Sequence, residues 1–346
     1  MALKLEIINP LMFDNWDNLV LSNKNYSFFH SSAWANVLHK SYHYTPLYFL
    51  SLDSKQLKVL IPLMEVNSIL TGRRGVSLPF SDLCEPIINA NIDTSDVLDF
   101  IIRYGKKSSW KYIELRTSRK LDNSIQASEL FLAHTLDLQK NEQNLFSKFR
   151  SSTKRNIKKA KKNEVNVGIF DSAESIKEFY RMNCLTRRRH GLPPQPASFF
   201  RYIHNYIIKK NMGIVVLASY RKKIISGAIY FHFGKRAFYK YGASDMNYQY
   251  LRANNLVMWA GIKWYCQNGY ELLHMGRTEP DNNGLKQFKN GWGTKEAQMH
   301  YYRYDLKENK YVTHNNRTEG WHNKIFEKMP IPLARLVGSA LYSSVG

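Results

Sequence analysis

The chain of 346 residues carries 50 lysines and arginines against 28 aspartates and glutamates, a formal net charge of +22 at pH 7. This length suits two ordinary domains or one large one, and a hydrophobic content of 44% excludes an intrinsically disordered chain. The charge indicates an anionic partner. RNA, a phosphorylated or nucleotide-linked substrate and an anionic membrane surface all remain open, because charge alone does not choose among them.

Residues that bind metals are scattered. The three cysteines, Cys84, Cys184 and Cys266, lie far apart, and no CxxC motif or Cys/His cluster is present. We therefore expect no metal site. An odd, dispersed set of cysteines is also typical of a reducing compartment rather than of a disulfide-bonded secreted protein.

The N-terminal stretch MALKLEIINPLMF contains Lys4 and Glu6, so it does not resemble a signal peptide. The longest apolar runs are far shorter than the ~20 residues that span a bilayer. We expect a cytoplasmic protein, and a peripheral contact with the inner face of the membrane remains an open alternative.

The first part of the chain, residues 1–145, alternates strand-like and helix-like segments. TPLYFLSL and LKVLIPLMEV predict a hairpin around the turn Asp53-Ser54-Lys55. VLDFIIRYGKKSSW predicts an amphipathic helix, and KYIELRT predicts a strand in which Glu114 and Arg116 form a structural ion pair. We assign these segments to an N-terminal domain.

A strongly basic segment opens the second part. SKFRSSTKRNIKKAKK predicts a helix that is capped by Ser151 or Ser152 and runs to about Lys162. Cations on such a helix can contact RNA phosphates, and a solvated cationic surface is the alternative. The candidates for RNA or phosphate binding are Lys154, Arg155, Lys158 and Lys159. We place the domain boundary just before this helix, so that the second domain is 146–310.

Three further helices are predicted by SAESIKEFYRMNCLTRRRH, SFFRYIHNYIIKKN and LRANNLVMWAGIKWYCQNG, with Ser172 capping the first and Gly269 ending the last. GIVVLASYRKKIISGAIYFHFGKRAFYKYGAS predicts three strands with two tight turns, and YELLHMG predicts one more. This order predicts an α+β (mixed α/β) fold with a mixed sheet.

The last segment, residues 311–346, is predicted to be helical on both sides of Pro330 and Pro332. We expect these helices to pack back on the N-terminal domain. Their apolar stripe leaves a membrane contact open as the alternative.

Five blocks of the second part mix cationic, aromatic, glycine and amide residues: FRSSTKRNIKKAKK, TRRRHG, YKYGAS, ANNLVMW and FKNGWG. In these blocks, and in their order, the sequence resembles the Fem-type peptidyltransferases (FemA, FemB, FemX) and their relatives in envelope-polysaccharide clusters. The resemblance implies two domains of the GNAT acyltransferase fold in tandem. It also implies transfer of an acyl group, usually aminoacyl from aminoacyl-tRNA, to an amine of a cell-wall precursor.

The resemblance assigns roles to several residues. Lys289 matches a family lysine near the reacting centre, where a cation binds an acceptor carboxylate or stabilises the oxyanion. Thr186, Arg188 and Arg189 lie in a family-like pattern, and arginine forks suit the phosphates of a diphosphate-linked acceptor. A cationic helix end is the alternative for these arginines.

Tyr239 and Tyr241 are predicted on one face of a strand, with Lys240 opposite. They are candidates for hydrogen bonding to the acceptor or for lining an acyl pocket, with core packing as the alternative. We group Tyr241 with Lys289 and Asp82 as catalytic candidates, since Asp82 of SLPFSD is a carboxylate that can bind or deprotonate the acceptor amine.

Asn254 and Asn255 open the ANNLVMW helix, and Arg277 of MGRT is a candidate anion ligand or a partner of Glu279. In acetyl-CoA-dependent GNAT proteins this helix follows a glycine-rich loop that cradles pyrophosphate. Residues 249–254 contain no glycine. We therefore expect no tightly bound cofactor, and we favour aminoacyl-tRNA over acyl-CoA or an acyl carrier protein as donor.

Three functions follow. The first is an N-acyltransferase acting on the amine of a nucleotide- or lipid-linked peptidoglycan or polysaccharide precursor, with tRNA as a partner. The second is a thioester-dependent N-acyltransferase that modifies an amino sugar of a polysaccharide. The third is a non-catalytic RNA- or membrane-binding protein that has kept the fold.

Overall fold

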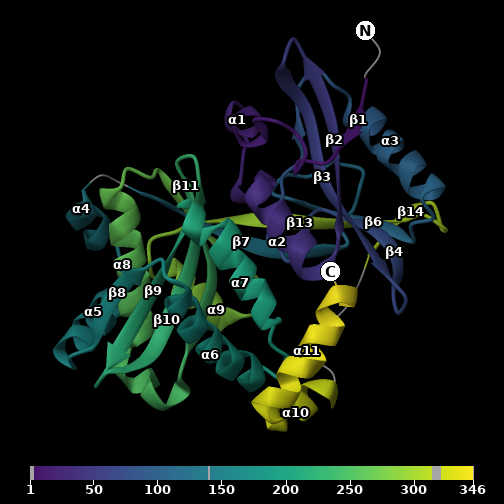
Figure 1. Ribbon diagram of the computed structural model, residues 1–346. Coiled ribbons are helices and arrows are strands. Elements are labelled where there is room, and N and C mark those ends of the chain that lie inside the picture. The colour runs from purple at the N-terminus through teal and green to yellow at the C-terminus, as the bar shows by residue number, and fades with distance from the viewer. Residues whose placement is uncertain (1–3, 139–140, 314–320, 346) are drawn as a thin grey trace. The chain divides into compact units, whose positions relative to one another are not determined.

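The computed structural model describes residues 4–138, 141–313 and 321–345. The chain divides into two compact units (Figure 1). Unit 1 comprises Met1–Leu132, Ala297–Asn316 and Leu341–Gly346, and unit 2 comprises Ala133–Glu296 and Arg317–Ala340. The two boundaries near positions 132 and 296 fall within strands β7 (Glu129–Asp137) and β13 (Lys295–Asp305). The division thus differs from the predicted one, in which the second domain is 146–310.

Unit 1 is built on a mainly antiparallel sheet with the strand order β1-β2-β3-β4-β6-β13, in which only β4 and β6 are parallel. Two short strands, β5 and β14, pair with β3 and β13. The predicted hairpin is confirmed as β2 and β3. The strands are β1 (Glu6–Ile8), β2 (Thr45–Asp53), β3 (Gln56–Ser68), β4 (Gly72–Val76), β5 (Ile87–Ile88), β6 (Tyr112–Thr117) and β14 (Lys310–Val312).

The helices of unit 1 are α1 (Trp16–Leu21), the 3₁₀ turn η1 (Phe28–His30), α2 (Ser32–Tyr42) and α3 (Thr94–Lys107). Helix α3 is the predicted amphipathic helix. Val97 and Ile101 on its apolar side belong to one core cluster with Phe49, Ile61 and Trp110. Each large apolar side chain buried in this way contributes about 1.5–3 kcal/mol, so the pattern of α3 fixes which side faces the sheet.

A buried ion-pair network lies on the sheet of unit 1. Glu114 accepts a hydrogen bond from Arg116 at 2.8 Å and another from Arg303 at 2.8 Å, which confirms the predicted Glu114–Arg116 pair. Burial pushes the pKa of Glu114 up, but the two guanidinium groups outweigh it and lower the pKa to about 2.

Because the pKa of Glu114 is lower in the folded chain than its ordinary value of 4.5, its ionised form stabilises the fold above about pH 4.5. This stability, about 3 kcal/mol, should be lost as the pH falls toward 2. We expect Glu114→Gln to flatten the loss of unfolding free energy measured by urea denaturation between about pH 5 and pH 3. Glu308→Gln, in an exposed pair with Lys310, is the control and should keep the wild-type slope; equal slopes for all three proteins would contradict the assignment.

Unit 2 contains a second sheet with the strand order β7-β12-β11-β10-β9-β8. The pairs β8–β9, β9–β10 and β10–β11 are antiparallel. The parallel pairing of β11 with β12 covers Arg236–Phe238 against Leu272–His274, while β11 continues to Ser244 and β12 to Thr278. The strands are β8 (Asn166–Phe170), β9 (Gly213–Tyr220), β10 (Lys223–Phe233), β11 (Arg236–Ser244) and β12 (Leu272–Thr278).

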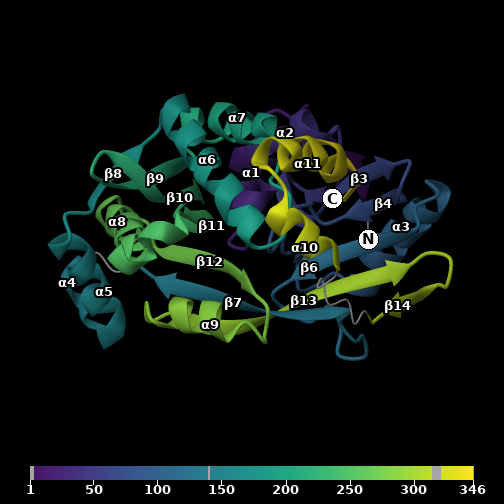
Figure 2. The same cartoon turned by 90° about the horizontal axis from the view of Figure 1, so that it is seen from below.

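Helices cover both faces of this sheet, with α8 on one side and α6 and α7 on the other (Figure 2). The predicted cap of α6 is confirmed, since Ser172 accepts the N–H of Ser175 at 3.2 Å, and Gly269 follows α8 at a φ of 73°. The helical elements are α4 (Glu142–Ser147), α5 (Ser151–Lys162), α6 (Ala173–Arg189), α7 (Ala197–Tyr206), η2 (Ile208–Lys210), η3 (Met246–Leu251), α8 (Ala253–Gln267) and α9 (Asn283–Asn290).

The prediction that Tyr239 and Tyr241 share a strand face is wrong. The register between β10 and β11 shifts at a β-bulge, so that Tyr230 pairs with Tyr239 and Ile229 with Tyr241, and Lys240 is the extra residue. Tyr239 packs on Tyr230 in the core beneath α8. The Tyr241 ring instead lies 5.7 Å from that of Phe200 on α7, on the opposite face.

The C-terminal helices are α10 (Trp321–Lys328) and α11 (Ile331–Val345). Residues 321–340 group with unit 2, whereas 311–313 and 341–345 group with unit 1, the unit on which we predicted that 311–346 pack; residues 314–320 lie outside the described part of the chain. The Arg335 guanidinium lies 5.2 Å from the centre of the Tyr180 ring. A Cβ on Gly338 would collide with the carbonyl of Pro194, so the small residue lets α11 approach closely.

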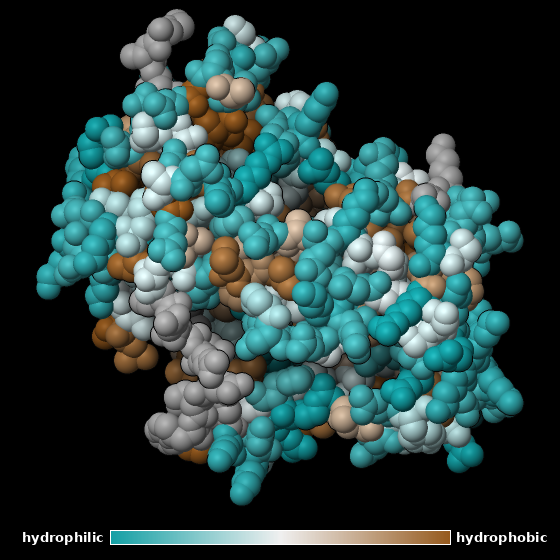
Figure 3. Space-filling model, turned by 180° about the vertical axis from the view of Figure 1, so that it is seen from behind, coloured by the Kyte–Doolittle hydropathy of each residue, from teal (hydrophilic) through white to brown (hydrophobic). Residues whose placement is uncertain are grey.

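No helix among the described residues is long and apolar enough to cross a bilayer. Hydrophilic side chains cover most of the face shown in Figure 3. The three cysteines are buried and reduced, and burial raises the pKa of the Cys84 and Cys184 thiols.

Candidate functional site

The end of strand β11 is held by side chains from two helices. The Ser244 N–H donates to Thr186 Oγ1 at 3.1 Å, and Thr186 Oγ1 donates back to the Ser244 carbonyl at 3.3 Å. From α8, Asn254 Nδ2 donates to Ser244 Oγ at 3.3 Å, and Asn254 Oδ1 accepts from Ser226 Oγ at 2.5 Å. Three of the sequence blocks, TRRRHG, YKYGAS and ANNLVMW, thus meet at Ser244.

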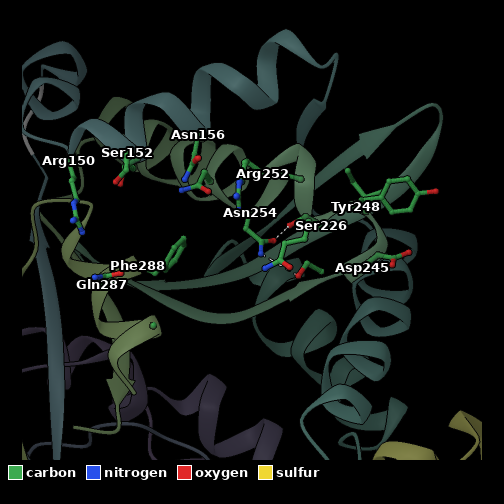
Figure 4. Close-up of a pocket in the computed structure, with 17 residues that line it drawn as sticks. Arg150, Ser152, Asn156, Ser226, Asp245, Tyr248, Arg252, Asn254, Gln287 and Phe288 are labelled. Atoms are coloured by element: carbon green, nitrogen blue, oxygen red, sulfur yellow. Dashed lines mark hydrogen bonds between the residues drawn. The ribbon is translucent and has the colours of Figure 1, made fainter. Parts of the chain in front are cut away.

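A cavity of about 360 Å³ opens beside this junction. Arg150 and Gln287 lie toward one end and Tyr248 toward the other, with Asn254 between them (Figure 4). The lining residues come from α5, β10, β11, η3, α8 and α9 and from the residues directly before α5, η3 and α8, and all belong to unit 2.

Two helices point their N-termini at the cavity. Arg150 is the N-cap residue of α5 and Arg252 that of α8, and neither side chain caps its helix. Both arginines line the cavity, together with Ser152 and Thr153 of the first turn of α5. A helix N-terminus presents N–H donors and a partial positive charge, so the cavity attracts an anion beside these two helix ends.

At the Tyr248 end of the cavity, the carboxylate of Asp245 is neutralised by a lysine. Asp245 accepts a hydrogen bond from Lys223 Nζ at 3.2 Å and one from the Asn247 N–H at 3.1 Å. The Lys223 ammonium also lies 4.7 Å from the centre of the Tyr248 ring. The lining therefore carries the charge of Arg150 and Arg252 against one compensated carboxylate.

Arg252 has an unusual backbone conformation, with φ 61° and ψ 29° in the left-handed region. A residue with a Cβ is strained there by about 1–2 kcal/mol relative to glycine. The loop before α8 thus takes a glycine-like shape without a glycine, and it places a guanidinium in the cavity wall instead.

Lys289 is buried, with 3% of its surface exposed. Its ammonium donates to the carbonyls of Gly276 at 3.0 Å and Arg277 at 2.8 Å, at the end of β12. These bonds join the MGRT and FKNGWG blocks and fix a cation inside unit 2, where water screens its charge weakly.

Other buried polar groups lie near Lys289. His134 shares a hydrogen bond with Asn290 Oδ1 at 3.0 Å, and its pKa is lowered by burial and then by the charge of Lys289. Within the described residues, His134 Nε2 and Trp292 Nε1 are buried without a hydrogen-bond partner. No pattern in the sequence singles out either residue.

The remaining site predictions lie in several places. Arg189 contacts the His190 ring nitrogen at 3.0 Å, and Arg188 is half-buried one residue before it on α6. Arg277 lies 3.8 Å from Glu279 in an ion pair, and Asn255 is buried in the first turn of α8 and lines the cavity.

The tyrosines and Asp82 are placed differently. Burial raises the pKa of Tyr239 to about 12, so its phenol stays protonated at neutral pH. Tyr241 is half-buried against α7, away from the α8 face. Asp82 belongs to unit 1, where its backbone carbonyl accepts a hydrogen bond from the Tyr301 hydroxyl at 2.6 Å.

The four cations predicted for RNA or phosphate binding lie on α5. Its apolar residues Ile157 and Ala160 are buried in the core that includes α8. Lys154 donates to the carbonyl of Ser147, and Arg155, Lys158 and Lys159 are exposed. None of the four forms an ion pair within the described part of the chain, so their charge faces solvent.

The sequence did not single out Arg150, Ser226, Ser244 or Arg252. Arg150 and Arg252 each stand directly before a helix. Serine and asparagine are the usual N-cap residues, so we considered the serines and asparagines at these two helix starts instead. No group of three or more His, Cys, Asp or Glu residues in the described ranges is arranged to hold a metal ion.

Comparison with known proteins begins with unit 2. Residues 147–290 match the acetyltransferase (GNAT) domain family. A stretch of 156 residues is 28% identical to the UDP-N-acetylmuramoylpentapeptide-lysine N(6)-alanyltransferase of Weissella viridescens. It makes up 44% of this chain and 45% of the alanyltransferase, so the match spans less than half the length of this relative.

Two solved structures share the fold. FemX aligns with a TM-score of 0.68 at 14% identity, over 88% of this chain and 98% of its own. A tandem GNAT protein from the clavulanic acid biosynthesis pathway aligns with a TM-score of 0.56 at 7% identity, over 88% and 99%. The predicted mixed α/β fold with two GNAT-like domains in tandem is confirmed, as is the resemblance to the Fem-type transferases.

The backbone of Arg252 predicts an unusual order of stability among variants. Arg252→Gly should melt at or above the wild-type temperature, because glycine relieves about 1 kcal/mol of strain. Arg252→Ala keeps the strain and should melt below Arg252→Gly. Thermal unfolding followed by circular dichroism measures the order, and a glycine variant that melts below the alanine variant would contradict the left-handed assignment.

Proposed function

We propose that the protein is an N-acyltransferase of the Fem type, because residues 147–290 match the acetyltransferase (GNAT) domain family and the chain shares the fold of FemX. It transfers an aminoacyl or acyl group to an amine of a cell-envelope precursor, of peptidoglycan or of a polysaccharide. The alanyltransferase similar to this chain is named for transfer to a lysine of a UDP-linked muramoylpentapeptide, which supports an amine acceptor of this class.

The observation that carries the proposal is the cavity at the N-termini of α5 and α8. It offers Arg150, Arg252 and two sets of helix N–H groups to a phosphate. A second hollow of about 360 Å³ shares Arg150 and Gln287 with it and is also lined by Lys286 and Asn290. Two adjoining cationic hollows suit a donor with more than one phosphate.

We propose aminoacyl-tRNA as this donor, with acyl-CoA or an acyl carrier protein as the competing candidate. The exposed cations of α5 follow directly on the cavity along the helix, so phosphates of an RNA stem can be bound next to its 3′ end. The reaction would then take place in the cytoplasm, where charged tRNA is found.

The chemistry requires no covalent enzyme intermediate. The acceptor amine attacks the carbonyl carbon of the ester, the carbonyl oxygen becomes an oxyanion, and the ribose oxygen leaves with the proton that the amine gives up. We propose that the Lys289 ammonium stabilises the developing negative charge or binds an acceptor carboxylate. Tyr241 and Asp82 remain the candidates for proton transfer, and Thr186, Arg188, Arg189, Tyr239, Arg277, Asn254 and Asn255 those for substrate binding.

The donor is tested by supplying the protein with charged tRNA and, separately, with labelled acyl-CoA. Each reaction contains an amine-bearing nucleotide-linked or lipid-linked sugar as acceptor. Amide product with charged tRNA is expected. If only the thioester gives product, the donor is acyl-CoA and not aminoacyl-tRNA. If neither gives product while RNA still binds, the result favours a non-catalytic RNA-binding protein.

Lys289 is expected to affect turnover more than donor binding. Lys289→Ala and the volume-preserving Lys289→Met should each lower kcat by about 100-fold, the effect of losing one oxyanion donor, with a small change in donor KM. Lys295→Ala, which removes an exposed lysine near the same helix, is the control. A kcat within a few-fold of wild type in a folded Lys289→Met variant would remove Lys289 from the site.

The cations of α5 are expected to set the salt dependence of donor binding. Neutralising Lys154, Arg155, Lys158 and Lys159 together with glutamine should weaken tRNA binding. It should also reduce the slope of log K against log salt by about 0.7–0.9 for each phosphate that the protein no longer neutralises. Binding is measured by fluorescence anisotropy over a salt series, and a slope equal to that of the wild type would place the RNA elsewhere.

A further inference from the structure

We propose that the turn between β3 and β4 in unit 1 is a membrane-docking tip, at which Ile69 and Leu70 enter the interface of an anionic lipid bilayer. This inference does not rest on the proposed function, because none of the groups that carry it belongs to the cavity of unit 2.

The tip exposes two large aliphatic side chains side by side in sequence. Ile69 is fully exposed and Leu70 is 75% exposed. Tight turns are usually built from glycine, asparagine, aspartate and serine, whose side chains suit water. Neither side chain is buried in the folded chain, so core packing does not explain why isoleucine and leucine occur at this turn.

The turn itself is well formed. The hydroxyl of Ser68 accepts the N–H groups of Leu70 at 3.2 Å and Thr71 at 3.3 Å, and Gly72 has a φ of 82°. These interactions hold the backbone of the turn, so Ile69 and Leu70 are presented in a fixed conformation at the end of β3.

The base of the hairpin is anchored to the end of the chain. Thr71 Oγ1 donates to the Ser344 carbonyl at 2.9 Å, and Arg74 Nη2 donates to the same carbonyl at 2.7 Å. Arg74 is buried and its guanidinium lies 5.9 Å from the centre of the Tyr112 ring. A rigid support of this kind lowers the entropy lost when the tip binds a surface.

Cations lie at this base. The Lys111 side chain lies over Gly72, and the Lys111 N–H donates to the Arg73 carbonyl at 2.8 Å. Arg73 pairs with Glu65, and the exposed Lys106 and Lys107 end helix α3 a few residues before Lys111 in the chain. Lys111 and Arg73 thus place positive charge at the base of an apolar tip.

This combination favours a lipid surface over a protein partner. A specific protein interface needs on the order of 1,000 Å² of buried surface, which two side chains at a narrow turn do not supply. Membrane binding needs less area, because apolar insertion and attraction to anionic lipids act together.

The test is sedimentation of the full chain with vesicles of phosphatidylcholine alone and of phosphatidylcholine mixed with phosphatidylglycerol. Binding is expected with the anionic vesicles only. The double variant Ile69→Ser with Leu70→Ser should weaken it by at least about tenfold, with an unchanged melting temperature. Met12→Ser removes an apolar side chain that is 85% exposed in the same unit and should leave binding unchanged.

A chain of net charge +22 also attracts anionic vesicles without any docking site, so charge requires its own control. Replacing Arg73, Lys106, Lys107 and Lys111 with glutamine should reduce binding by at least about 25-fold, because Arg73 and Lys111 lie at the base of the tip and each cation next to the membrane contributes about fivefold. The matched replacement of Lys154, Arg155, Lys158 and Lys159 on α5 should reduce it much less. An equal loss from both quadruple variants would overturn the proposal, as would full binding by the Ile69/Leu70 variant. A change in the sedimentation coefficient of that variant without vesicles would point to self-association instead.

Discussion

The geometry of the candidate site depends on one constraint, the fixing of the end of β11 at Ser244. Thr186 of α6 clamps the backbone of this residue from one side of the sheet, and Asn254 of α8 holds its hydroxyl from the other. One helix from each face of the sheet of unit 2 is thereby tied to a single strand end. The cavity lies where it does because the first turn of α8 cannot move relative to that strand without breaking these bonds.

Around this fixed point the chain separates two kinds of positive charge. The guanidinium groups of Arg150 and Arg252 stand in the cavity wall, open to a ligand. The ammonium of Lys289 is instead enclosed and saturated in part by the carbonyls of Gly276 and Arg277. An exposed cation is screened by water and suits the binding of a phosphate, whereas an enclosed cation acts strongly on charge that develops close to it. For this reason the proposed function assigns phosphate binding to Arg150 and Arg252 and charge stabilisation during the reaction to Lys289.

Local patterns in the sequence predicted local structure well. The stripe of α3, the serine cap of α6 and the glycine after α8 each act through neighbours a few residues away, so a single sequence contains the information. The resemblance of five blocks predicted the fold. What escaped prediction depends on distant partners. The bulge at Lys240 is a property of two strands together, and the close approach of α11 to the loop at Pro194 depends on the space that Gly338 leaves.

The backbone of Arg252 has a consequence for protein engineering. At this position the stability of the fold and the charge of the cavity favour different residues. The backbone conformation favours glycine, whereas an arginine adds a positive charge to the cavity wall. Laboratory selection for heat resistance, or replacement by whichever residue best suits the local backbone, would drive this position toward glycine or asparagine. A protein stabilised in that way would keep only one of the two arginines that line the cavity. Its crystal structure would be a poor guide to the natural ligand.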